Sequence, residues 1–373
     1  MTETKITAPA PSAATDAGQS NKYIDILSDF GAEVKPSAGF YDPFDDFDPN
    51  YLKTMSMPEL YDRVFTTKPP IIDGFLYPGV YLFVGAPKVG KSFLMAQLAY
   101  HVSTGTAMWN YEIKPATVLY LALEDDYARL QSRFYRMFGT DSADNLHFST
   151  VANSVNGGLE NQLRGFIEAH KDTKLVIIDT LQKVREESKE TYSYANDYQI
   201  IARLKSFAGA YGICLMLVHH TRKQQADDKF DMISGTNGLL GAADGAFVMH
   251  KEKRTANAAI LEISGRDQQD QKLYLTRNQE KLTWELDRAE TDLWKEPPEP
   301  LLEIIVRKIT PDCPTWQGSP TELVTFLGVD IQPNALSMKL NVNAGRLLQN
   351  YGISYAAKRT HGGRQIFLAR VDP

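Results

Sequence analysis

Residues 85–92 read Gly85-Ala86-Pro87-Lys88-Val89-Gly90-Lys91-Ser92, which is the pattern G-x-x-x-x-G-K-S without a gap. An apolar run at 80–84 precedes this stretch, and a helical pattern at 93–99 follows it. A strand, a glycine-rich loop and a helix in this order predict a loop whose backbone N–H groups hold phosphates, assisted by the positive end of the helix dipole. The alternative is a glycine-rich turn that binds nothing, and the four fixed positions with their flanks argue against it.

The same stretch predicts how a nucleotide would be held. The expected binding residues are consecutive: Gly85, Ala86, Pro87, Lys88, Val89, Gly90, Lys91, Ser92 and Phe93. Lys91 would reach the outer phosphates of ATP, and the hydroxyl of Ser92 would bind Mg²⁺. ATP and Mg²⁺ are therefore the expected cofactors.

The bulk composition is that of a soluble protein with more than one domain. A chain of 373 residues is too long for one ordinary core, so we expect two or three units. The longest clean apolar run, 213–218, is too short to cross a bilayer, and the N-terminus lacks the pattern of a signal peptide. Cys214 and Cys313 give neither a disulfide framework nor a metal pattern. These features predict a cytoplasmic protein without membrane contact.

Charge limits how the chain can contact nucleic acid. The net charge of −6 argues against a uniformly basic surface. Residues 1–50 carry three Lys and nine Asp or Glu, whereas residues 301–373 carry eight Lys or Arg and five Asp or Glu. Any contact with nucleic acid is therefore expected to be local.

Composition divides the chain into a tail, a large domain, a linker and a small domain. We expect residues 1–56 to be disordered or loosely packed, because their start is rich in Ala, Thr, Ser and Pro. Residues 57–293 form the expected large domain. Residues 294–300 contain Glu-Pro-Pro-Glu-Pro and predict a stiff linker, and residues 301–373 form the expected small domain.

The large domain alternates apolar strands with helical patterns. The expected strands are residues 80–84, 118–123, 175–178 and 213–218, and helices are expected up to 138 and over 159–170 and 198–210. Such alternation predicts an α/β fold with a mostly parallel sheet and helices on both faces. Shorter apolar runs between 245 and 286 lack a long helix between them, and they predict an antiparallel extension of the sheet.

The small domain reads as three short helices and a basic hairpin. Residues 319–322, Ser-Pro-Thr-Glu, form a capping box that begins the first helix, and two further helices are expected over 334–340 and 344–350. Strands at 353–357 and 365–368 flank a basic, glycine-containing tip. Together these elements predict a winged helix.

Two acidic residues at strand ends are candidates for the chemistry of phosphate transfer. Asp179 ends the apolar strand 175–178, which is the Walker B arrangement and predicts a metal-binding carboxylate beside Ser92. The following residue is not acidic, so the group that activates water must come from elsewhere. Glu124 ends strand 118–123 and is the expected base, while Asp125 suits an N-cap of the next helix. The alternative for each acid is a capping role.

The pair His219-His220 ends the strand 213–218. Zinc binding is not expected, because the other histidines are scattered and no cysteine lies at ligand spacing. We expect His220 to sense the γ-phosphate and to pass its state to the next loop, with a structural role as the alternative. Two polar loops, 182–196 and 221–238, leave the sheet at the same edge. We expect them to respond to bound ATP, and the alternative is that they are solvated surface loops.

The order of strand-end glutamate, Walker B aspartate and strand-end histidines resembles the RecA-type ATPase core. Within it, the chain resembles the RepA-like hexameric helicase group of plasmids and mobile elements over roughly residues 57–290. The motif stretches that carry the resemblance are 80–92, 118–126, 175–180, 217–221 and 241–244. The resemblance implies a homo-oligomer, a hexameric ring, with ATP between subunits and loops 182–196 and 221–238 lining a channel for single-stranded DNA. It also implies an arginine that acts from the neighbouring subunit, for which Arg266 matches best and Arg254 is the alternative.

Three functions remain to be weighed. The first is an ATP-driven, DNA-acting oligomer, a helicase or related motor in replication of a plasmid, phage or mobile element. The second is an ATP-switched initiator or regulator whose winged helix binds duplex DNA through cationic and amide side chains. These side chains are Asn343, Arg346, Gln349, Lys358, Arg359 and Arg364, and protein contact is their alternative role. The third, a small-molecule kinase, lacks an arginine-rich lid segment.

Overall fold

The computed structural model describes residues 52, 54–65, 68–185, 194–220, 237–251, 253, 256–266, 268–290, 299–360 and 363–371. The expected tail up to 51, most of the proline-rich linker, Arg254 and most of both loops expected to bind DNA lie outside these residues. The chain divides at 65/66 and at 303/304 into two compact units. One unit contains the P-loop, and the other joins the described N-terminal residues to the C-terminal residues.

A nine-stranded sheet organises the P-loop unit. Its strands are β1 (Gly79–Gly85), β2 (Thr117–Ala122), β3 (Leu146–Ser149), β4 (Thr173–Asp179), β5 (Cys214–His220), β6 (Gly245–His250), β7 (Ala258–Gly265), β8 (Gln268–Arg277) and β9 (Trp284–Ala289). Their order in the sheet is β3-β2-β4-β5-β1-β6-β7-β8-β9. Strands β3 to β6 in this order pair in parallel, and β6 to β9 pair antiparallel. The predicted α/β fold with an antiparallel extension is confirmed.

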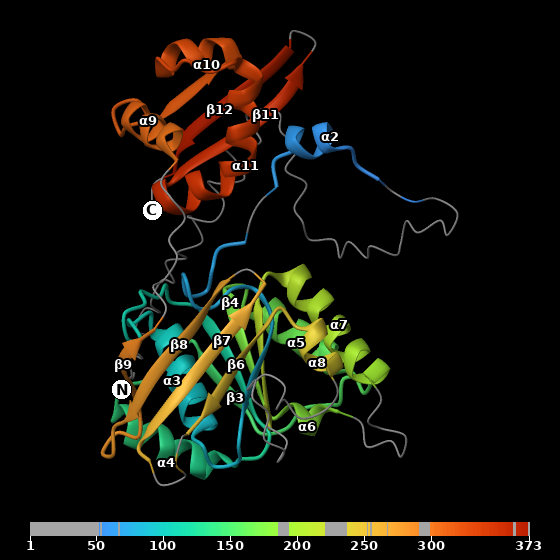
Figure 1. Cartoon of the computed structure of the whole chain (residues 1–373), viewed down its shortest axis with the longest axis vertical. Helices are drawn as coiled ribbons and strands as arrows, with labels where there is room; N and C mark the ends of the chain where they lie inside the picture. The colour runs from blue at the N-terminus through green and yellow to red at the C-terminus, as the bar shows by residue number, and fades with distance from the viewer. Residues whose placement is uncertain are drawn as a thin grey trace, which may run out of the picture. The chain divides into compact units, whose positions relative to one another are not determined.

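Helices cover both faces of this sheet. They are α3 (Lys91–Thr104), α4 (Tyr127–Phe138), α5 (Leu159–Ala169), α6 (Leu181–Val184), α7 (Tyr194–Tyr211) and α8 (Asn237–Ala242). Figure 1 shows α5, α7 and α8 together on one side. Helices connect the parallel strands of this sheet, because parallel strands need long connections. Since β1, β2, β4 and β5 run in the same direction, their carboxyl ends lie at one edge of the sheet.

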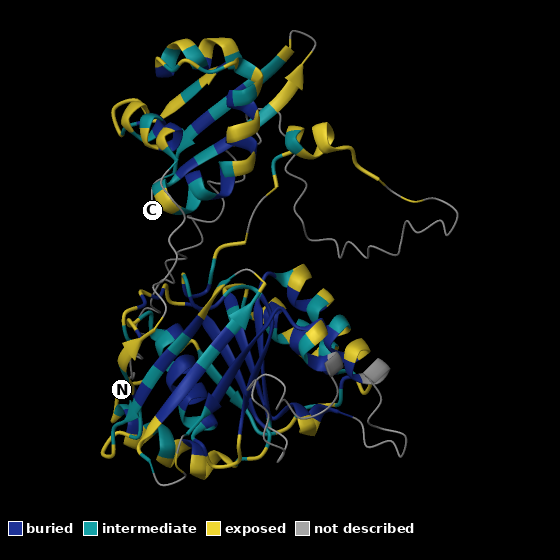
Figure 2. Cartoon of the chain, in the orientation of Figure 1, coloured by how far each residue is buried: buried dark blue, intermediate teal, exposed yellow. Residues whose placement is uncertain are grey.

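The side chains of β1 show why the sheet is buried on both faces. Tyr81 and Phe83 belong to the core cluster on one face, and Val80, Leu82 and Val84 belong to the cluster on the other. All seven residues of β1 are buried, and Figure 2 shows the central strands in dark blue. A strand with two buried faces reads as a continuous apolar run, which is the pattern that its sequence shows.

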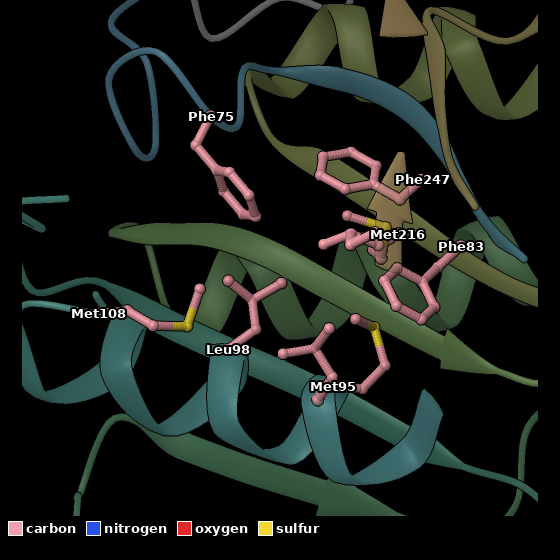
Figure 3. A pocket seen from close by; sticks show the side chains of 9 residues that line it. Phe75, Phe83, Met95, Leu98, Met108, Met216 and Phe247 are labelled. Atoms are coloured by element: carbon pink, nitrogen blue, oxygen red, sulfur yellow. The ribbon is translucent and has the colours of Figure 1, made fainter. Parts of the chain in front are cut away.

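A small void lies within the first of these core clusters. Its lining side chains, among them Phe75, Phe83, Met216 and Phe247, are drawn as sticks in Figure 3. Its volume is about 10 Å³, which is hardly enough for one water molecule. The void is an imperfection of apolar packing and not a ligand site.

The second unit combines helices with a three-stranded antiparallel sheet. Its elements are α2 (Met57–Asp62), α9 (Pro300–Lys308), β10 (Thr315–Gly318), α10 (Pro320–Leu327), α11 (Pro333–Tyr351), β11 (Ile353–Thr360) and β12 (Gly363–Arg370). The sheet order is β10-β12-β11. The expected capping box is present, because the Ser319 hydroxyl accepts from the Glu322 N–H and the Glu322 carboxylate accepts from the Ser319 N–H.

Two expectations for this unit need correction. The helices expected over 334–340 and 344–350 are one continuous helix, α11, since no proline or glycine interrupts 341–343 and Asn341 is buried by packing. The hairpin strands are also longer than expected, so Lys358, Arg359 and Arg364 lie within β11 and β12 and not in the turn. The order helix, strand, helix, helix, strand, strand is compatible with the winged helix that we expect.

Helix α2 packs against α11 in this unit. The Asn341 side-chain amide donates to the Tyr61 carbonyl at 2.7 Å, and the Tyr355 hydroxyl donates to the Asn341 carbonyl oxygen at 2.8 Å. Arg364 forms an ion pair with the Asp62 carboxylate and donates to the Asp62 carbonyl at 3.0 Å. Residues 57–65, which we expected at the start of the large domain, therefore group with the C-terminal residues.

Over the described ranges, no helix is both long and apolar enough to span a membrane.

Candidate nucleotide-binding site

The P-loop runs from the end of β1 to the start of α3, and packing explains its two glycines. A Cβ on Gly85 would lie 2.5 Å from the Met249 carbonyl oxygen, and a Cβ on Gly90 would lie 2.6 Å from the Trp284 ring. Gly90 also has a φ of +116°, which disfavours any side chain. Both positions therefore require glycine, for contacts on the side of the loop formed by β6 and β9.

Lys91 is held at the centre of the loop by three hydrogen-bonding groups. Its Nζ lies 2.7 Å from the Gly85 carbonyl oxygen, 3.1 Å from that of Ala86 and 3.2 Å from the Nδ1 of His220. Only 6% of the residue is exposed. Burial lowers the pKa of Lys91 to about 8, although the charges of Asp179 and Glu124 oppose this shift.

His220 ends β5 and reaches this lysine, while His219 is buried. Burial, followed by the charge of Lys91, lowers the pKa of His220. The ring is therefore neutral near pH 7, and its Nδ1 can accept a hydrogen bond from the ammonium group. This contact joins the P-loop lysine to the strand that precedes residue 221.

Asp179 ends β4 and lies beside Ser92. Its carboxylate accepts a hydrogen bond from the Tyr120 hydroxyl at 3.0 Å and another from the Ser92 side chain. Burial raises the pKa of Asp179, and these two hydrogen bonds oppose the shift. A hydroxyl and a carboxylate that already face one another fit the oxygen ligands that Mg²⁺ prefers, directly or through its water molecules.

Glu124 follows β2, and the pairing of β2 with β4 brings it near Asp179. Its carboxylate accepts from the Thr180 hydroxyl at 3.1 Å. The expectation that Asp125 caps the next helix is wrong. Asp126 caps α4 by accepting from the Arg129 N–H at 2.8 Å.

Asp125 instead forms ion pairs with two arginines of α4. The distances between nitrogen and oxygen are 2.6 Å to Arg133 and 3.4 Å to Arg129. These arginines are four residues apart and share one face of the helix. Their spacing from Asp125 is the signal by which the sequence could have revealed this cluster.

These side chains line one cleft of about 520 Å³, a volume suited to a nucleotide. The cleft contains Lys91, Ser92, Glu124, Asp179 and His220, which the sequence singled out. Pro87, Lys88, Gly90 and Phe93, also expected from the sequence, line it too, and the further lining residues are Ala122, Asp125, Arg129, Arg133, Thr180 and Arg277. Of the expected site residues, Gly85, Ala86, Val89 and Arg266 do not line this cleft.

Sequence reasoning missed the contribution of the β8–β9 hairpin. Arg277 ends β8, and its guanidinium carbon lies 4.2 Å from the centre of the Phe93 ring, on which Arg133 also lies at 5.2 Å. Trp284 begins β9 and exchanges two hydrogen bonds with the Gln97 side chain, of 2.9 and 2.7 Å. No motif marks these positions, because they approach the P-loop only through tertiary packing.

Arg266 lies apart from the cleft of its own chain. Its guanidinium donates to the Gly241 carbonyl at 3.3 Å, and it is not among the residues that line the cleft.

A mostly parallel sheet with a P-loop after β1, an aspartate ending β4 and a glutamate after β2 defines a RecA-type P-loop ATPase domain, and this protein is such an ATPase. Residues 51–226 match the model of a family of AAA domains. No curated protein matches the chain.

Two solved structures are similar to parts of this chain. A KaiC-like protein from Pyrococcus horikoshii has 14% sequence identity and a TM-score of 0.41, with 61% of this chain and 99% of that chain covered. A DnaB-like replicative helicase, whose structure was solved with its interactions with primase, has 15% identity and a TM-score of 0.48, with coverages of 71% and 70%.

Proposed function

We propose that this protein is an oligomeric, DNA-acting ATPase of the cytoplasm, a RepA-like helicase or helicase-related motor that serves replication of a plasmid, phage or mobile element. The observation that carries the proposal is the contact between Lys91 and His220. A motor must pass the state of its γ-phosphate to the segment that holds its track. The histidine touches the phosphate-binding lysine and directly precedes the polar segment 221–238, so it supports such a coupling.

Five side chains of the cleft have a role in this proposal: Lys91, Ser92, Glu124, Asp179 and Thr180. The P-loop amides and Lys91 would bind the phosphates, and Ser92 and Asp179 would hold Mg²⁺, whose positive charge would stabilise the transferred phosphoryl group. Glu124 takes a proton from the attacking water, and the Thr180 hydroxyl keeps the carboxylate oriented for that task. A general base contributes about 10²–10⁴-fold to such a step.

The track and the ring are further parts of the proposal. Segments 182–196 and 221–238 follow β4 and β5, whose carboxyl ends meet at the cleft, so single-stranded DNA bound there would respond to hydrolysis. Arg266 would act in trans, since its position apart from the cleft of its own chain suits a role at a neighbouring subunit. A residue that acts in trans requires a homo-oligomer, and we propose that this assembly is a hexameric ring.

The test combines ATPase rate with mass. Purified protein is assayed with and without single-stranded DNA, and its mass is measured by light scattering with ATP and Mg²⁺ present. We expect DNA-stimulated hydrolysis and a mass several times the 41.8 kDa of one chain. Lys91→Ala is the control and should abolish hydrolysis. Hydrolysis that no nucleic acid changes, by a protein that stays monomeric, would overturn the proposal.

An alternative function, an ATP-switched initiator or regulator, is favoured by the C-terminal unit. Arg359 is exposed on β11. In a winged helix that binds duplex DNA, a cationic side chain at this position would contact the DNA. Arg364 differs, because it already pairs with Asp62.

Duplex binding by the full chain over a range of salt concentrations tests this alternative. Arg359→Ala should lower the slope of log affinity against log salt by about one, and Arg364→Ala should lower it less. Glu124→Gln should abolish function under the first proposal, whereas the alternative allows this variant to keep its function. The absence of salt-sensitive duplex binding would contradict the alternative.

A further inference from the structure

We propose that Tyr120 is a positioning residue of the ATPase site, whose buried hydroxyl fixes the Asp179 carboxylate in the orientation that Mg²⁺ requires. The proposal rests on the proposed Mg²⁺ ligands, Ser92 and Asp179. Tyr120 was not among the residues that the sequence singled out, because it lies inside an apolar strand.

Tyr120 is buried in the core beside the strand that ends at Asp179. It lies on β2 opposite Ile177 of β4, two residues before Asp179 on the neighbouring strand. The residue is fully buried, with 0% of its surface exposed. Its ring belongs to the core cluster that α3 covers, so the side chain extends beneath the start of α3.

The Tyr120 hydroxyl contacts both Asp179 and Ser92. Tyr120 Oη donates to Asp179 Oδ2 at 3.0 Å and lies 3.5 Å from the backbone carbonyl oxygen of Ser92. Both partners belong to the two residues proposed to hold Mg²⁺. A phenylalanine would fill the same core volume without a polar atom. A hydroxyl buried here is therefore explained by its contact with the site and not by packing.

The Asp179 carboxylate depends on few groups for its orientation. Asp179 is 7% exposed, so water contributes little to holding its oxygens. Tyr120 and the Ser92 side chain are the hydrogen-bond donors identified for it among the described residues. Without the tyrosine hydroxyl, the carboxylate loses one of two donors and can rotate away from the orientation that faces the metal. Loss of such an outer partner typically weakens metal affinity by about 10–100-fold.

The experiment compares two tyrosine-to-phenylalanine variants in the full chain. Tyr120→Phe removes the proposed contact. Tyr111→Phe is the matched control, because Tyr111 is also buried and donates its hydroxyl to Gln271, at 2.8 Å, away from the cleft. Binding of a fluorescent, non-hydrolysable ATP analogue is titrated with Mg²⁺ for wild type and both variants, and thermal unfolding verifies that each is folded.

We expect the Mg²⁺ concentration at half-maximal binding to rise about tenfold in Tyr120→Phe and to stay unchanged in Tyr111→Phe. Saturating Mg²⁺ should restore most of kcat in Tyr120→Phe, because the metal then enforces the orientation itself. A midpoint within twofold of wild type, or an equal shift in both variants, would refute the role of Tyr120. Wild-type protein that binds the analogue without any Mg²⁺ dependence would instead remove the proposed metal site.

Discussion

The lowered pKa of Lys91 predicts that nucleotide affinity falls as pH rises from 7 to 9. In the nucleotide-free protein, burial lowers the pKa of the Lys91 side chain to about 8. The ammonium group faces Asp179, Glu124 and His220, and the histidine is neutral throughout this range because its own pKa is lowered. Phosphates held by Lys91 favour the charged form, so binding at high pH must first return a proton to the free lysine.

The magnitude follows from the protonated fraction of the free protein. With a pKa of about 8, about 90% of the lysine is charged at pH 7 and about 10% at pH 9. If the bound phosphates keep Lys91 protonated, the affinity falls about tenfold between these pH values, equivalent to about 1.4 kcal/mol. The nucleotide adds little to this change, because the last phosphate pKa lies near 6.

Titration of a fluorescent ATP analogue at constant Mg²⁺, at several pH values from 7 to 9, measures this effect. Calorimetry near pH 8 in two buffers of different ionisation enthalpy should detect uptake of about half a proton on binding. Lys91→Arg is the control, because arginine stays charged over the whole range and its affinity should stay flat. Wild-type affinity that does not change with pH, or an equal fall in Lys91→Arg, would refute this reasoning.

Three further outcomes are expected. Glu124→Gln should keep ATP binding but slow single-turnover hydrolysis by about 10²-fold or more, and an unchanged rate would assign the base to another acid. Mixing Arg266→Ala with Lys91→Ala subunits should restore part of the ATPase rate, and mixed oligomers that show no recovery would exclude this arginine. Gly90→Ala should lower the free energy of unfolding more than Gly139→Ala, which also has a positive φ but has no atom within 4 Å of the added Cβ. The difference, about 1–3 kcal/mol for overpacking against the indole ring, is read from denaturant unfolding, and equal losses would contradict the contact.

The sequence predicted those parts of the molecule that depend on local patterns. The P-loop follows from glycine spacing between a strand and a helix, and strand-end acids meet because parallel strands share one edge. Strand β3 was not expected, since its four residues are only partly buried and carry no strong apolar signal. The cluster of Asp125 with its two arginines shows the limit of cap prediction. Two adjacent aspartates both suit a cap, and only tertiary packing selects Asp126.

Contacts between distant segments could not be predicted in this way. Helix α11 was expected to break near Asn341, but this asparagine is buried within the helix. Its side-chain amide donates a hydrogen bond to the Tyr61 carbonyl of α2, and its side-chain oxygen accepts one from the Tyr355 hydroxyl. Arg364 looked free for phosphate, yet it pairs with a carboxylate about 300 residues earlier in the chain. Such pairings depend on complementary surfaces that no single stretch of sequence encodes.

The contact between Gly90 and Trp284 has a consequence for how this protein matures on the ribosome. The Trp284 indole donates to the Gly90 carbonyl oxygen at 3.4 Å, although the two residues are 194 positions apart in the chain. A nascent chain that has reached residue 226, where the family match ends, already contains the whole phosphate-binding motif. It still lacks β6, which pairs with β1, and β9, which packs behind the loop. Nucleotide can therefore assist folding only late in synthesis, and an expression fragment that ends at residue 226 should neither fold stably nor retain ATP.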